Sequence, residues 1–197
     1  MEIIINENNN TIRMEQALAR ITDDNLNNLI DGLNIVLTDE ITATSIYNDE
    51  YNIFPRSYED GLGGNKGNII HNGIRKHLVV VNFRNADSIQ LNNDELDAVL
   101  VHELGHLLNK NIPLPVPSPI HGVTQEEIKN IQATNSKSSE FYADHLAKLL
   151  DKEEGLISSI RKFVESNLCA NEELFQERIE KLESDEEFPG EVLPMLN

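Results

Sequence analysis

The sequence contains no tryptophan, one cysteine and few aromatic residues, which make up only 5% of its 197 residues. A single cysteine, Cys169, excludes an internal disulfide bond. Because 39% of the residues are apolar although few are aromatic, we expect a core of mainly aliphatic side chains. A chain of this length is typical of one domain with one hydrophobic core.

Positive charge is also scarce in this sequence. Lys and Arg total 16 against 34 Asp and Glu, which gives a formal net charge of -18 at pH 7. Such a chain repels phosphate backbones and anionic lipid surfaces, so we expect no nucleic-acid partner. We interpret the acidity as a solubilising surface, with a preference for basic substrates as the alternative.

Long apolar runs are missing as well. The most apolar segment, residues 78–81, is far shorter than the roughly 20 residues that a membrane-spanning helix needs. The first residues lack the basic start and the apolar stretch of a signal peptide. We therefore expect a cytoplasmic protein that does not insert into a membrane.

The pattern of apolar residues predicts helices and one clear strand in the first half of the chain. Helical spacing predicts one or two helices in residues 14–37, and abundant Asn, Asp and Gly predict a long loop at 47–68. The β-branched residues at 77–84 predict a strand, which Ile69 and Ile70 would pair with. Asn92, followed three residues later by Glu95, predicts a capped helix that continues to Leu108.

The second half of the chain is expected to be helical after a proline-rich loop at 113–119. Helices are predicted at 124–130, at 140–150 and in two later amphipathic segments. We thus expect an α+β protein, mostly helical, with a small mixed or antiparallel sheet packed on the helix at 93–108. Its single domain would comprise N-terminal helices and a long loop (1–68), a core (69–183) and an acidic tail (184–197).

The pentapeptide His102-Glu103-Leu104-Gly105-His106 matches the zinc-peptidase motif H-E-x-x-H. On a helix, positions four residues apart lie on one face, so both imidazoles can reach one metal ion while Glu103 sits beside it. The alternative interpretation is a helix whose two histidines are satisfied by ordinary hydrogen bonds.

A catalytic zinc ion normally takes three protein ligands, so the motif predicts one more ligand downstream. The residues after His106 lack the Gly and His of metzincins, which excludes that class. The remaining candidates are His121, Glu126, Glu127, Glu140, Asp144 and His145. Glu140 is the strongest candidate because it begins a predicted helix, on which Asp144 follows one turn later and can accept a hydrogen bond from a ligating imidazole.

Residues 97–106, together with 140–144, resemble gluzincin metallopeptidases, in particular the HtpX and CAAX-prenyl-protease group and its soluble relatives, the minigluzincins. The resemblance spans residues 69–183 and implies a zincin-like fold with one Zn²⁺ per chain. It also implies that His102, His106 and Glu140 bind the ion and that Asp144 supports a zinc-bound histidine. Relatives often carry a His-Pro that this chain lacks at residues 171–176. The candidates for the oxyanion helper are His121, Tyr142, His145 and Arg178.

These observations predict a soluble zinc endopeptidase that acts on peptide or protein substrates, with Glu103 as the general base. If the strand at 77–84 is the sheet edge beside the cleft, it could bind an extended substrate by strand addition. The residues expected to do so are Leu78, Val79, Val80, Val81 and Asn82. The alternative function is a zinc-binding regulatory or interaction protein with weak or no proteolytic activity.

Overall fold

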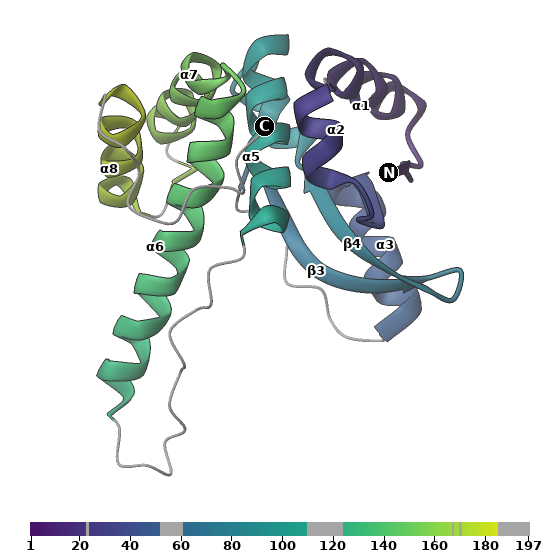
Figure 1. Ribbon diagram of the computed structural model, residues 1–197, viewed down its shortest axis with the longest axis horizontal. Helices are drawn as coiled ribbons and strands as arrows, with labels where there is room; N and C mark the ends of the chain where they lie inside the picture. The colour runs from purple at the N-terminus through teal and green to yellow at the C-terminus, as the bar shows by residue number, and fades with distance from the viewer. Residues whose placement is uncertain (23, 52–60, 110–123, 167, 170, 185–197) are drawn as a thin grey trace.

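The helix that carries the H-E-x-x-H motif, α5 (Asn93–Leu108), lies in the middle of the molecule (Figure 1). The structure is a computed structural model that describes residues 1–22, 24–51, 61–109, 124–166, 168, 169 and 171–184. The predicted capping box begins α5: the Asn92 side chain accepts a hydrogen bond from the Glu95 amide, and the Glu95 carboxylate accepts one from the Asn92 amide. Most α5 side chains are buried, because elements cover the helix on several sides.

One side of α5 packs against a four-stranded sheet. Its strands are β1 (Glu2–Ile3), β2 (Ile35–Asp39), β3 (Gly63–His71) and β4 (Ile74–Val81). They lie in the order β1-β2-β4-β3, in which β1 and β2 pair in parallel, as do β2 and β4, while β3 and β4 are antiparallel. The sheet is therefore mixed, and β3 is its edge beyond β4.

The two faces of the sheet belong to different apolar clusters. Val79 and Val81 join the main core, to which α5 contributes Leu100 and Leu104. Leu78 and Val80 point to the opposite face, where they pack with residues of α3 (Glu40–Tyr51). This alternation is the usual consequence of the two-residue period of a strand.

Six further helices in the described part of the chain complete the fold (Figure 1). Near the N-terminus, α1 (Asn8–Ile21) and α2 (Asp24–Ile30) lie on the sheet side of α5, and the short α4 (Phe83–Ser88) follows β4. On the other side lie α6 (Gln125–Leu149), α7 (Glu153–Glu165) and α8 (Glu172–Glu183). These helices and the mixed sheet confirm the prediction of a mostly helical α+β protein. No helix within the described ranges is long and apolar enough to cross a membrane.

Four sequence predictions differ from the structure. Residues 35–39 form strand β2 instead of continuing a helix, because an apolar run this short shows no helical period. Both ends of the predicted loop at 47–68 are regular structure: α3 extends to Tyr51, and β3 begins at Gly63, where pairing with β4 overrides the low strand propensity of Gly and Asn. Residues 52–60 of that prediction lie outside the described residues. The strand predicted at 77–84 starts and ends earlier, as β4. The helices predicted at 124–130 and 140–150 are one continuous α6. The proline-rich loop at 113–119 lies outside the described residues.

Candidate metal centre

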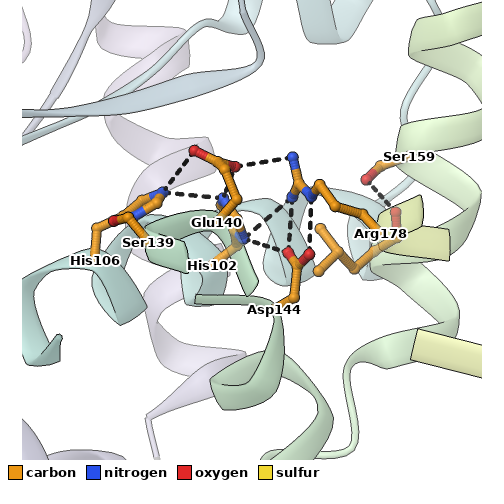
Figure 2. A network of polar contacts seen from close by, with 8 residues as sticks. His102, His106, Ser139, Glu140, Asp144, Ser159 and Arg178 are labelled. Atoms are coloured by element: carbon orange, nitrogen blue, oxygen red, sulfur yellow. Dashed lines mark hydrogen bonds and ion pairs between the residues drawn. The ribbon is translucent and has the colours of Figure 1, made fainter. Parts of the chain in front are cut away.

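The two histidines of the motif project from one face of α5 into the same space (Figure 2). Their Nε2 atoms are 3.2 Å apart, and the rings meet edge to face with centroids 4.7 Å apart. The helical period brings them together, because His102 and His106 are separated by one turn. Both side chains line a cleft of about 670 Å³.

Helix α6 adds a carboxylate to this pair. Glu140 Oε2 lies 3.3 Å from His102 Nε2, and Glu140 Oε1 lies 3.5 Å from His106 Nε2. Ligand atoms of the three residues all lie within 4.8 Å of one another, and among the described residues they form the single such group of metal-binding side chains. Two imidazoles and one carboxylate are a donor set of catalytic zinc sites, which keep a further position for water. The sequence prediction of Glu140 as the partner of the two histidines thus agrees with the geometry.

The Nδ1 atom of each histidine contacts a different side chain. His102 Nδ1 lies 2.8 Å from Asp144 Oδ1, whose residue is completely buried. His106 Nδ1 lies 3.0 Å from Ser139 Oγ, one residue before Glu140 (Figure 2). Hydrogen bonds at Nδ1 orient a histidine so that Nε2 can bind a metal ion. The arrangement therefore points both Nε2 atoms toward Glu140.

Arg178, from α8, ties the acidic residues of the site together. Its Nε and Nη2 atoms donate to the two oxygens of Asp144 at 2.8 and 2.7 Å, and its Nη1 lies 2.9 Å from Glu140 Oε2. The side chain is only 5% exposed and its guanidinium lies over the Phe175 ring. A bidentate arginine–carboxylate pair is geometrically specific, so Arg178 fixes Asp144 and Glu140 relative to each other.

The other candidates for the oxyanion helper lie differently. The Tyr142 hydroxyl donates to the backbone carbonyl of Leu108, at the end of α5, over 3.0 Å. His145 is half-buried on α6 and does not line the cleft, whereas His121 lies outside the described residues. Arg178 is the one described candidate whose side chain lines the cleft beside the histidines and Glu140.

The crowding of charged groups separates the pKa values of the two histidines. Burial and the Arg178 charge lower the pKa of His102, but its hydrogen bonds to the Asp144 and Glu140 carboxylates outweigh them and raise it to about 9. Burial and the neighbouring His102 lower the pKa of His106 to about 4. Burial alone would raise the pKa of the Glu140 carboxyl, but His102 and Arg178 hold it well below its usual range. At neutral pH His102 is therefore protonated and His106 neutral, so the histidine pair carries one positive charge.

Glu103 lies beside these groups at the edge of the cleft. Its side chain is 6% exposed and faces the start of strand β3, where residues 61–64 also line the cleft. Apolar residues of α5, α7 and α8 also line the cleft: Val99, Leu156, Ile160, Phe163, Leu174 and Phe175. The cleft thus combines the polar groups of the metal centre with an apolar lining.

The expected substrate-binding strand is wrong in one respect. Leu78, Val79, Val80 and Val81 belong to β4, which pairs with β2 on one side and with β3 on the other, so this strand is not a sheet edge. Asn82 follows β4 and caps α4. The edge strand whose beginning lines the cleft is β3. Sequence reasoning predicted only the part of β3 around Ile69 and Ile70, because residues 61–67 have the composition of a turn.

Sequence reasoning also missed Ser139, which contacts the ligand His106. Its position directly before Glu140 was the available signal, because residues next to a ligand on a helix can reach a neighbouring ligand.

Comparison of the chain with protein-family models, with curated proteins and with solved structures finds no match.

Proposed function

We propose that the protein is a zinc-dependent endopeptidase of the gluzincin type. The observation that carries this proposal is the convergence of His102, His106 and Glu140 beside Glu103 in an open cleft. The three residues would hold one Zn²⁺ through two nitrogens and one oxygen, a set that suits catalytic zinc. A zinc ion there would supply a Lewis acid that acidifies water and polarises a carbonyl group.

Glu103 would act as the general base in peptide hydrolysis. Its carboxylate would accept a proton from the attacking water as the new carbon–oxygen bond forms, and would return that proton to the leaving amine as the carbon–nitrogen bond breaks. The position of Glu103 supports this role, because it directly follows His102 on α5 and lines the cleft. Arg178 keeps Glu140 and Asp144 in place through its ion pairs.

Strand β3 supports recognition of an extended substrate in this proposal. It is the sheet edge that reaches the cleft, and residues 61–64 present mostly main chain there. Main-chain pairing with an edge strand binds extended peptides with little demand on their sequence. We therefore expect unfolded protein segments to be better substrates than folded domains.

The proposal is tested by metal analysis together with cleavage of an unfolded test protein and a peptide library. Wild-type protein should bind about one zinc ion per chain and cleave, whereas Glu103→Gln should keep the zinc and lose cleavage. Glu165→Gln, an exposed substitution of the same kind on α7, is the matched control and should behave as wild type. Equal cleavage by Glu103→Gln would reject the mechanism.

The same experiment separates the alternative function. A wild-type protein that binds zinc tightly but cleaves nothing would favour a zinc-binding regulatory or interaction protein. A protein that binds no zinc would reject both functions. Loss of zinc on Glu140→Ala, but not on Ala substitution of the exposed Glu126, would support the assignment of Glu140 as third ligand.

A further inference from the structure

Gly63, the first residue of β3, lies directly against the Glu103 side chain. A Cβ atom built on Gly63 would lie 2.7 Å from both Cγ and Oε1 of Glu103 and 2.9 Å from its Cδ. Non-bonded carbon contacts are most favourable at about 3.5–4.0 Å, so any side chain at position 63 would displace one of the two partners. The backbone of Gly63 does not have a positive φ, so the glycine serves this contact rather than a special conformation.

The main chain around Gly63 is anchored by groups outside the metal centre. The Asn85 side chain donates to the Gly61 carbonyl at 2.9 Å, and the Asn82 amide donates to the Leu62 carbonyl at 2.9 Å. The Glu40 carboxylate accepts hydrogen bonds from the backbone amides of Phe83 and Arg84, beside both asparagines. Because these polar residues are buried, the cleft wall at 61–63 is a fixed surface.

We propose that Gly63 is a positioning residue that confines the Glu103 carboxylate beside the histidine pair by bringing the anchored β3 main chain into contact with it. The catalytic consequence of this inference rests on the proposed peptidase function, whereas the contact between Gly63 and Glu103 does not depend on that function. A general base that is already confined need not lose rotamer freedom when the reaction begins. An added methyl group at position 63 would push Glu103 away from its place or move the wall outward.

The catalytic consequence is tested with Gly63→Ala. We expect kcat to fall on the order of 100-fold, as displacements of about 1 Å can cause, with KM and zinc content little changed. Gly73→Ala is the matched control, because Gly73 lies in the turn of the same hairpin with φ +73° and has open space around its Cβ position. That variant should lose stability through backbone strain and keep its kcat, so a general weakening of the hairpin is separated from misplacement of the base.

A double-mutant cycle on thermal stability tests the contact between Gly63 and Glu103 and does not require catalytic activity. Gly63→Ala should lower the melting temperature by about 3–8 °C in the protein with Glu103, as overpacking does in a chain of this size. In the Glu103→Ala background, which removes all three contacted atoms, the same substitution should change the melting temperature by less than about 1 °C. Equal losses in both backgrounds, or an unchanged kcat in an active Gly63→Ala protein, would overturn the inference. An inactive wild type that shows the expected cycle would reject the peptidase function alone.

Discussion

His102 and His106 belong to one motif but meet different surroundings. A buried carboxylate, Asp144, stands behind His102, whereas a hydroxyl, that of Ser139, stands behind His106. Burial lowers the pKa of both rings, but hydrogen bonds to Asp144 and Glu140 raise that of His102, whereas the neighbouring His102 lowers that of His106 further. The pair therefore carries a single positive charge over a wide range of pH.

This arrangement predicts that zinc binding releases a proton. With pKa values of about 9 for His102 and about 4 for His106, only His102 is protonated at pH 7, and zinc must displace that proton. The apparent association constant should therefore rise about tenfold per pH unit from about pH 5 to 8 and level off above about pH 9. Titration calorimetry in buffers of different ionisation enthalpy measures the proton count directly. A zinc affinity independent of pH between 6 and 8 would contradict this picture.

The support behind His102 can be tested separately with Asp144→Asn. The substitution removes the charge that stabilises the ring and leaves Arg178 with a weaker partner, so zinc affinity should fall by about 10–100-fold. Competition with a chelator of known affinity measures the change. Asp151→Asn is the control: Asp151 is exposed just beyond the same helix and has φ +53°, which asparagine tolerates. Equal zinc affinity in the two variants would show that Asp144 does not support the ligand.

At the scale of elements, the site depends on how closely α5 approaches α6. A Cβ atom on Gly105 would lie 2.8 Å from the Cα and 3.1 Å from the carbonyl oxygen of Ala143. Two small residues thus let the helices touch through their backbones, one residue before His106 and three residues after Glu140. This close approach helps to bring the ligands of the two helices together.

Gly105→Ala should therefore destabilise the protein, although alanine is the better helix former by about 1 kcal/mol. Overpacking costs about 1–3 kcal/mol, so we expect a net loss of up to about 2 kcal/mol in the free energy of unfolding and weaker zinc binding as α6 moves away. Urea denaturation and chelator competition measure the two effects. Ser138→Ala, on an exposed part of α6, should leave both unchanged. A stabilised Gly105→Ala protein would mean that helix propensity outweighs the contact.

Elements with strong local signals could be predicted from the sequence. The Asn92 and Glu95 capping box fixed the start of α5, and helical spacing then placed His102, Glu103 and His106 on it. The helix at Glu140 likewise put Asp144 one turn later. The part of β3 around Ile69 and Ile70 was predicted, but its first residues were missed because they have the composition of a turn. Strand β2 was missed because its formation depends on pairing with β4, which lies distant in sequence. For the same reason the contact between Gly63 and Glu103 could not be predicted.

At the scale of the whole molecule, the first 39 residues are part of the same core as the metal centre. Met14, Ala17 and Ile21 of α1 are buried in the cluster that contains α5. Arg20 makes a bidentate ion pair with Asp97 of α5, whose side chain is 1% exposed. Strand β2 is completely buried between β1 and β4. The boundary expected at residue 68, between the N-terminal part and the core of the domain, therefore lies within a single sheet and a single hydrophobic core.

This integration predicts the outcome of removing residues 1–34, the segment before β2. If that segment were a detachable inhibitory peptide, its removal would leave a folded and more active protein. Because the deletion takes away α1, α2 and β1 and exposes one edge of β2 and the apolar surface of α5, we expect a chain without a cooperative thermal transition and without tight zinc binding. Circular dichroism during heating and metal analysis are the measurements. A truncated chain that unfolds cooperatively and binds zinc as the full chain does would show that the N-terminal segment is dispensable.

Arg20→Ala tests the same interface mildly. It leaves the buried Asp97 without its partner, so it should lower the free energy of unfolding by about 1–3 kcal/mol while zinc still binds.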